Sequence, residues 1–258
     1  MFRNGGTAAM SHRLEGQTAI ITGAAQGLGQ AIAHGLWLEG ASVVLCDIDA
    51  KVSEAAESIS PDGARVSVRQ FDVADEAAWD EVVTSVTADH GSLEIVVNNA
   101  AMTVSKSVWD IPVDEWDRVL AVNLRGVFLG CRSAGRVMKQ AGYGRIINLS
   151  SLAGQRGGVV AGAHYSASKG GILALSKCFA QELAGDGVTV NCIAPAAIEG
   201  PMSRAMPQEK VQGLARTIPV QRLGQDTEVA AAAVYLSDPA NGFVTGTTLD
   251  VNGGVLMR

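Results

Sequence analysis

The stretch that decides the fold is Thr18-Ala-Ile-Ile-Thr-Gly-Ala-Ala-Gln-Gly-Leu-Gly29. Its first five residues form a β-branched and apolar run, which predicts a short buried strand. Glycines follow in the spacing Gly-x-x-x-Gly-x-Gly, and apolar residues at helical spacing, among them Ile32 and Leu36, continue to Gly40. We therefore expect a strand, a glycine turn and a helix whose free N-terminal N–H groups suit a pyrophosphate. The alternative is an ordinary turn between a strand and a helix.

A second apolar run, Ser42–Asp47, predicts the next strand and ends in a carboxylate about 20 residues after the glycine turn. An acid at that place can accept hydrogen bonds from the hydroxyls of an adenosine ribose, and it repels a 2′-phosphate. The glycine turn contains no arginine or lysine to bind such a phosphate. These residues predict NAD rather than NADP as the cofactor. The alternative is that Asp47 or Asp49 caps a helix over residues 49–59.

The rest of the chain continues to alternate between strand and helix patterns. Further strands are expected at residues 65–71, 93–97, 144–150, 189–193 and 247–251, and further helices at 76–90 (capped by Asp75), 113–139, 163–184 and 227–236. Such alternation predicts right-handed crossovers and one parallel sheet of about seven strands, with helices on both faces. We expect a single α/β domain over residues 13–258 after a loose tail, residues 1–12. Residues 199–218 are only weakly periodic and suit a flap over a pocket.

Several polar residues come directly after predicted strands. The carboxyl ends of parallel strands meet at one sheet edge, which is where ligands bind in open α/β sheets. The glycine turn, Asp47, Asn99, Ser151 and the Tyr165–Lys169 pair should therefore converge there. Buried asparagines after a strand need partners, and backbone groups at that edge could supply them. Asn123 interrupts an apolar helix face, so it is either paired to the backbone or functional.

Tyr165 and Lys169 are four residues apart and lie one turn apart on a helix face. A free tyrosine has a pKa of ~10, too high for a base at neutral pH. A nearby ammonium group favours the phenolate and lowers that pKa, so the pair predicts a tuned acid/base. Tyrosine and lysine are also common on helix faces, so the spacing alone does not distinguish a catalytic pair from an ordinary one.

The composition excludes several classes of function. The 258 residues carry a net charge of −6, whereas a nucleic-acid partner requires a basic face. No apolar run reaches the ~18 residues of a membrane span. The four cysteines show neither metal-ligand spacing nor a paired framework, which predicts reduced thiols in a cytoplasmic protein and no metal site.

These motifs occur in a characteristic order, and together they resemble the short-chain dehydrogenase/reductase family in its one-domain, Rossmann-like form, over about residues 14–256. The motifs are Thr22-Gly-x-x-x-Gly-x-Gly29, Asp72-Val73, Asn98-Asn-Ala100, Asn123, Ser151, Tyr165-x-x-x-Lys169 and Asn191 with Pro195. The resemblance implies that Tyr165 exchanges a proton with the substrate oxygen and that Ser151 orients and polarises that oxygen. It also implies that Lys169 lowers the tyrosine pKa and binds the nicotinamide ribose, and that Asn123 holds a water in a proton relay.

The resemblance also implies a cofactor-binding set. Its members are Gly23, Gln26, Gly27, Leu28, Gly29, Asp47, Ile48, Asp72, Val73, Asn99, Ala100, Tyr165, Lys169, Pro195 and Ile198. The chain departs from the usual pattern at Ala101, Ala196 and Gly200. We expect an NAD-dependent oxidoreductase acting on a secondary alcohol or ketone, assembled as a homotetramer. The alternatives are a 3-oxoacyl thioester reductase and a non-catalytic nucleotide-binding scaffold.

Overall fold

The structure, a computed structural model, describes residues 12–158, 161–204 and 206–258. Its centre is one seven-stranded sheet in the order β3-β2-β1-β4-β5-β6-β7, and all neighbouring strands are parallel. The strands are β1 (Thr18–Thr22), β2 (Ser42–Asp47), β3 (Val66–Gln70), β4 (Ile95–Asn98), β5 (Gly144–Leu149), β6 (Val188–Pro195) and β7 (Thr248–Val251). The predicted fold class is confirmed, and β3 lies at one edge of the sheet.

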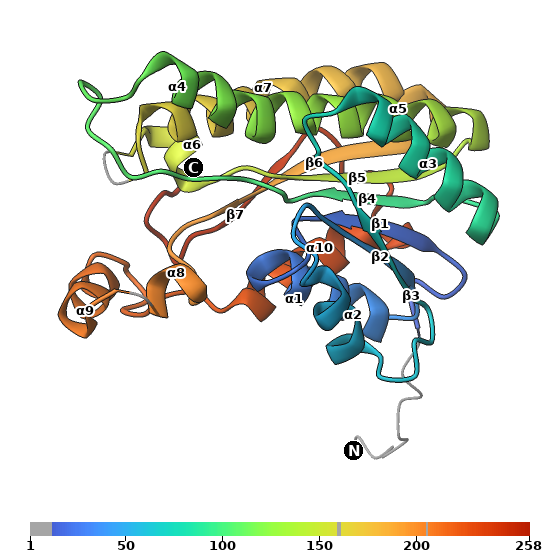
Figure 1. Cartoon of the computed structure of the whole chain (residues 1–258), viewed down its shortest axis with the longest axis horizontal. Helices are drawn as coiled ribbons and strands as arrows, with labels where there is room; N and C mark the ends of the chain where they lie inside the picture. Colours follow the sequence, from blue (N-terminus) through green and yellow to red (C-terminus); the bar gives the residue numbers. More distant parts are fainter. Residues whose placement is uncertain (1–11, 159–160, 205) are drawn as a thin grey trace, which may run out of the picture.

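Helices cover both faces of the sheet (Figure 1). They are α1 (Gly27–Leu38), α2 (Val52–Ile59), α3 (Glu76–His90), α4 (Val113–Leu120), α5 (Gly126–Ala141), α6 (Leu152–Arg156), α7 (Ala163–Leu183), α8 (Pro201–Arg204), α9 (Gln208–Arg216) and α10 (Asp226–Ser237). Helices α1, α2 and α10 pack on one face, and α3, α5 and α7 pack on the other. Within the described part of the chain, no helix is long and apolar enough to cross a membrane.

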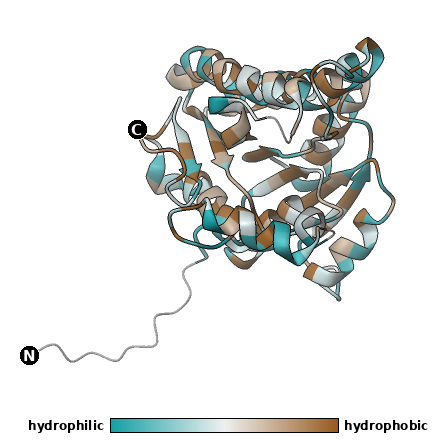
Figure 2. Ribbon diagram, turned by 90° about the vertical axis from the view of Figure 1, so that its left-hand side faces the viewer, coloured by the Kyte–Doolittle hydropathy of each residue, from teal (hydrophilic) through white to brown (hydrophobic). Residues whose placement is uncertain are grey.

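The core consists of two hydrophobic clusters separated by the sheet. Consecutive residues of β1 point to opposite sides, so that Ile21 joins Leu36 in one cluster and Ile20 joins Trp79 in the other. Figure 2 shows hydrophobic residues along the strands between the two helical layers. The central strands are therefore apolar on both faces, which explains why they read as continuous hydrophobic runs in the sequence.

The predicted helix over residues 113–139 is interrupted. A π-helical segment, Ala121–Arg125, separates α4 from α5 and contains the buried Asn123. A π-turn holds one more residue than an α-turn, which changes the direction in which the following side chains point. Apolar periodicity did not reveal this break, because the residues on both sides remain helical.

Two other predicted segments also differ. The helix expected from residue 49 begins at Val52, and its N-cap, Lys51, makes no side-chain capping bond among the described residues. Residues 199–218 contain the short helices α8 and α9, and their role as a flap over a pocket stays a prediction. Helix α9 buries none of its residues, which explains the weak apolar signal. The predicted tail lies outside the described residues except for His12, whose Nδ1 lies 3.3 Å from the Leu38 carbonyl oxygen.

Candidate active site

The glycine turn packs closely against the N-terminus of α1, whose first N–H groups have no side-chain cap within the described chain. Gly23 and Gly27 have φ values of +66° and +59°, in the left-handed region that favours glycine. A Cβ atom on Gly29 would lie 2.1 Å from the Gly23 carbonyl oxygen, so the turn and the helix pack too closely for a side chain. Gln26 makes no capping bond within the described chain, and the first turn carries no acidic residue. This arrangement fits a pyrophosphate bound by the free N–H groups.

The end of β4 holds the glycine turn in place. The Asn99 side chain donates to the carbonyl oxygens of Thr22 at 2.9 Å and Gly23 at 3.1 Å. In return, the Thr22 hydroxyl oxygen accepts from the backbone N–H groups of Asn99 at 3.0 Å and Ala100 at 3.1 Å. The expectation that an asparagine serves backbone groups here is confirmed. Thr22 was not among the predicted site residues, although a threonine that ends a strand before a glycine turn was a usable signal.

Asp47 lies at the end of β2, beside the glycine turn. One carboxylate oxygen accepts from Ala25 N at 3.0 Å, and the other accepts from Asp49 N, also at 3.0 Å. Of the alternative that Asp47 or Asp49 caps the following helix, the contacts support Asp49, whose carboxylate accepts from Lys51 N at 3.0 Å just before α2. Each oxygen of a carboxylate can accept a second hydrogen bond, so Asp47 can still receive ribose hydroxyls. The neighbouring Ile48 is 66% exposed, an apolar surface next to that carboxylate.

The other predicted cofactor contacts lie at or just beyond the carboxyl ends of strands. Asp72 follows β3 and accepts from Ala74 N at 2.9 Å. Val73 is buried and packs against Gly126. A Cβ atom added to Gly126 would lie 3.0 Å from a methyl group of Val73. Pro195 is the last residue of β6, and Ile198 forms an isolated bridge with Gly224. The parallel topology thus brings the predicted residues to a single sheet edge.

The two serines after β5 make different contacts. The buried Ser150 donates its hydroxyl hydrogen to the Lys169 carbonyl oxygen at 2.8 Å, which ties α7 to the sheet. Ser151 is only partly buried, and its oxygen accepts from Ala153 N at 3.1 Å. Accepting that bond leaves the Ser151 hydroxyl hydrogen to donate either to the Tyr165 oxygen, whose pKa it lowers, or to a ligand. The geometry therefore favours Ser151, the serine chosen from the sequence.

Tyr165 and Lys169 lie on one face of α7 as predicted, with the Lys169 Nζ 5.6 Å from the centre of the tyrosine ring. The ammonium group donates to the Leu149 carbonyl oxygen at 2.6 Å, and burial lowers the pKa of Lys169 to about 8. Burial also raises the pKa of Tyr165, while the Ser151 side chain opposes that rise. The net pKa of Tyr165 in the protein without ligands is therefore raised because desolvation dominates, and the expectation that Lys169 lowers the tyrosine pKa stays a prediction.

The fully buried Asn123 connects the segment after β4 to α7. Its Oδ1 accepts from Met102 N at 2.8 Å, and its Nδ2 donates to the Met102 carbonyl oxygen at 2.9 Å and to Ser168 Oγ at 3.1 Å. Ser168 in turn donates to the Tyr165 carbonyl oxygen at 2.7 Å. Of the two alternatives left open by the sequence, pairing to the backbone therefore holds for the side chain of Asn123.

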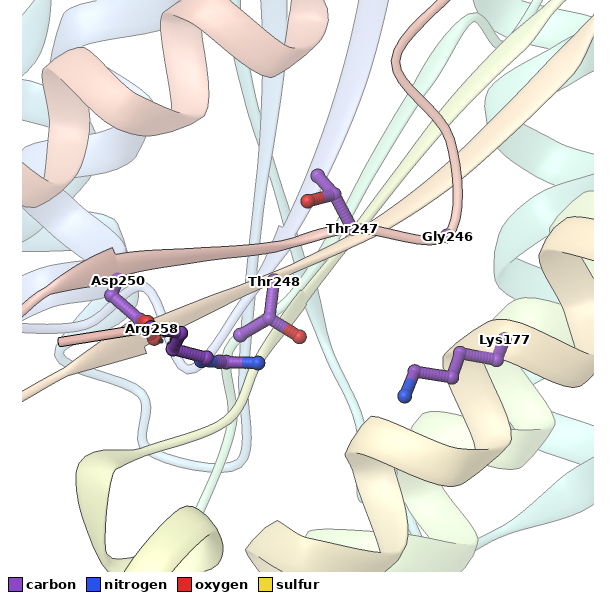
Figure 3. Close-up of a pocket in the computed structure, with 6 residues that line it drawn as sticks. All are labelled: Lys177, Gly246, Thr247, Thr248, Asp250 and Arg258. Carbon is purple, nitrogen blue, oxygen red and sulfur yellow. Dashed lines mark hydrogen bonds and ion pairs between the residues drawn. The ribbon is translucent and has the colours of Figure 1, made fainter. Parts of the chain in front are cut away.

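A separate hollow of about 440 Å³ lies between β7 and α7 (Figure 3). Lys177 lies across this space from Thr248 and Arg258, and Arg258 is paired to Asp250 at 3.0 Å. The hollow contains none of the predicted catalytic residues, so the edge around Tyr165 is the candidate active site. Among the described residues, no three His, Cys, Asp or Glu side chains are grouped to hold a metal ion.

A parallel doubly wound sheet with a glycine turn at its carboxyl edge defines a class of dinucleotide-binding proteins. A family profile described as "Enoyl-(Acyl carrier protein) reductase" matches residues 23–256. The chain belongs to the short-chain dehydrogenase/reductase family, and it is an oxidoreductase. The family expected from the sequence motifs is thereby confirmed.

Three similar proteins illustrate the range of relatives. The chain is 36% identical to "3-oxoacyl-[acyl-carrier-protein] reductase FabG" of Salmonella typhimurium, covering 94% of this chain and 98% of that protein. It is 37% identical to "2-dehydro-3-deoxy-L-rhamnonate dehydrogenase (NAD(+))" of Sphingomonas sp., over 94% of this chain and 96% of that protein. A solved structure from Agrobacterium tumefaciens, described as a proposed gluconate dehydrogenase, matches with a TM-score of 0.91 and 31% identity, covering 96% of this chain and 99% of that one.

Proposed function

We propose that this oxidoreductase uses NAD to interconvert a secondary alcohol and a ketone, with Tyr165 as the acid/base. The observation that supports this most is that the Ser151, Tyr165 and Lys169 group follows β5 at the same carboxyl edge of the parallel sheet as the glycine turn after β1. When bound, the nicotinamide accepts or donates the hydride. The chain itself supplies binding, orientation and proton transfer.

The roles proposed for the individual residues are those of the family, and the contacts of each side chain are compatible with them. The Tyr165 phenol exchanges a proton with the substrate oxygen, and the free hydroxyl hydrogen of Ser151 donates to that same oxygen. Lys169 binds the nicotinamide ribose and supplies positive charge below the tyrosine. Because its ammonium group already donates to the Leu149 carbonyl, its direction is set before any ligand arrives.

We propose NAD as the preferred cofactor because of the charges around Asp47. A 2′-phosphate would face this carboxylate at a turn that contains no lysine or arginine. Like-charge juxtaposition costs on the order of several kcal/mol, and every ~1.4 kcal/mol is tenfold. NAD should therefore be preferred over NADP by at least about a hundredfold. The name of the Sphingomonas relative, which specifies NAD(+), supports the same choice.

The second candidate is reduction of a 3-oxoacyl thioester, which the similarity to the Salmonella reductase favours. An oxidation screen with NAD, followed at the absorbance of the reduced nicotinamide, decides between the two. The panel contains sugar acids, polyols, alicyclic alcohols and 3-hydroxyacyl thioesters. Turnover of the thioesters alone supports the second candidate. Binding of NAD without turnover of any compound would support a nucleotide-binding scaffold and refute both.

We further propose a homotetramer in the cytoplasm. Large apolar side chains are exposed around α4 and α5, with Trp109 91%, Val113 75% and Phe128 37% exposed. Symmetric association would bury such a surface. All four cysteines are free, and three of them are buried, which fits a reducing compartment.

A further inference from the structure

His164 is a fully buried histidine immediately before Tyr165 in α7. The acid/base chemistry proposed above does not use its imidazole ring. A buried titratable ring next to the reacting residue needs hydrogen-bond partners for both of its nitrogens. The contacts of those two nitrogens show what the ring does.

The first nitrogen acts as a helix cap. Helix α7 begins at Ala163, and the residue before it is Gly162, which has no side chain to cap the free N–H groups of the first turn. The backbone N–H of Tyr165 instead donates to His164 Nδ1 at 2.8 Å. Tyr165 occupies the third helical position, whose N–H a serine or aspartate cap usually binds. His164 thus supplies the missing cap, and the group that it caps is the backbone N–H of Tyr165, the proposed acid/base.

The second nitrogen reaches a different part of the chain. Because Nδ1 accepts a hydrogen bond, the neutral ring carries its hydrogen on Nε2. That nitrogen lies 3.4 Å from Glu115 Oε1 in α4, while Glu115 Oε2 accepts from the Lys106 ammonium group at 2.8 Å. Lys106 also lowers the pKa of Glu115, which keeps the carboxylate charged. The three side chains therefore connect α7 to the segment between β4 and α4.

The ring is also held sterically. A Cβ atom on Gly162 would lie 2.6 Å from His164 Cε1 and 2.9 Å from the Val104 carbonyl oxygen. Gly162 has a φ of +80°, so its conformation also favours glycine. The imidazole therefore occupies a slot between the turn before α7 and the segment that carries Lys106.

We propose that His164 is a positioning residue that fixes the orientation of Tyr165 by capping its backbone N–H. Through Glu115, the same ring ties the tyrosine to Lys106 and the segment that precedes α4. This inference rests on the proposed function of Tyr165, but its structural part can be tested without any substrate.

The two nitrogens can be replaced one at a time. In His164→Asn, the side-chain oxygen takes the place of Nδ1, which keeps the cap and loses the contact with Glu115. In His164→Gln, the side-chain amide takes the place of Nε2, which keeps the contact with Glu115 and removes the cap on Tyr165 N–H. In His164→Leu, both the cap and the contact with Glu115 are removed. His90→Asn, at the far end of α3, is the matched control.

Turnover is measured with NAD and the alcohol that the screen identifies. We expect kcat to fall about tenfold in the Leu and Gln variants, because small misplacements of a reacting group are costly. The Asn variant should stay within about threefold of wild type, and the dissociation constant for NAD within about twofold in all variants. An Asn variant as slow as Leu, or NAD binding weakened in proportion to kcat, would overturn the proposal.

Amide hydrogen exchange of residues 163–166 in the protein without ligands provides the second measurement. Exchange should be faster in the Leu and Gln variants and unchanged in the Asn and control variants. Equal exchange in all of them would show that His164 does not cap α7. If wild-type protein turned over no alcohol, the proposed function would fail, while this measurement would still decide the role of the cap. Should the Leu variant not fold, the comparison of Asn with Gln is sufficient.

Discussion

Replacing Lys169 by methionine should change how stability depends on pH. Lys169 is only 3% exposed, and burial lowers its pKa from 10.5 to about 8. The folded-state pKa lies below the unfolded one, so between pH 8 and 10.5 the unfolded chain binds more protons and stability rises with pH. Below pH 8 Lys169 is charged in both states, and burying its ammonium group then lowers the free energy of unfolding by the full amount. The pKa of Lys169 falls from 10.5 in the unfolded chain to about 8 in the folded protein. At ~1.36 kcal/mol per pKa unit, this shift corresponds to a loss of stability of roughly 3 kcal/mol.

Urea unfolding of the protein without ligands measures this cost. The free energy of unfolding of wild type minus that of Lys169→Met should rise by about 2 kcal/mol between about pH 7.5 and 10, the share of the total that falls in this range. Taking the difference removes every other titrating group. Lys177→Met is the control, since Lys177 is an exposed lysine on the same helix and its difference should stay flat. A flat difference for Lys169→Met as well would mean that water reaches the ammonium group, and it would refute the argument from burial.

The remaining predictions concern catalysis, cofactor choice and assembly. Tyr165→Phe should retain the fold and NAD binding but lose ~10²–10⁴-fold in turnover, and a near-normal rate would remove Tyr165 from the mechanism. Alcohol oxidation should accelerate as the phenolate forms, and because burial raises the pKa of Tyr165, a pH–rate profile should show this rise on the alkaline side. Asp47→Ser should relax the preference for NAD, and Ile48→Arg should favour NADP. The measurement is the ratio of kcat/KM with NAD to kcat/KM with NADP, and an unchanged ratio in these variants would contradict the prediction. Light scattering should give four times the chain mass of 26.7 kDa, and a monomer at micromolar concentration would exclude the tetramer.

The sequence predicted the strand and helix pattern well wherever the signal was local. The bounds of β1, β2 and α3 agree with the prediction. Apolar runs that end at a glycine or at a capping aspartate mark such elements without reference to the rest of the chain. The alternation of strands and helices then predicted a parallel sheet. Because the carboxyl ends of parallel strands share one edge, it also predicted that Asp47, Asn99, Ser151 and Tyr165 lie at that edge.

The sequence by itself thus determined the fold class and the family, and it predicted a set of residues for the candidate site. Only the tertiary structure decided which hydrogen-bond partner each buried polar group has. It tied Ser150 to the carbonyl of Lys169, directed the Lys169 ammonium group to Leu149, and placed His164 between Tyr165 and Glu115. The physical reason is that periodicity reports which face of an element is buried, whereas the partner of a buried polar atom comes from segments distant in the chain.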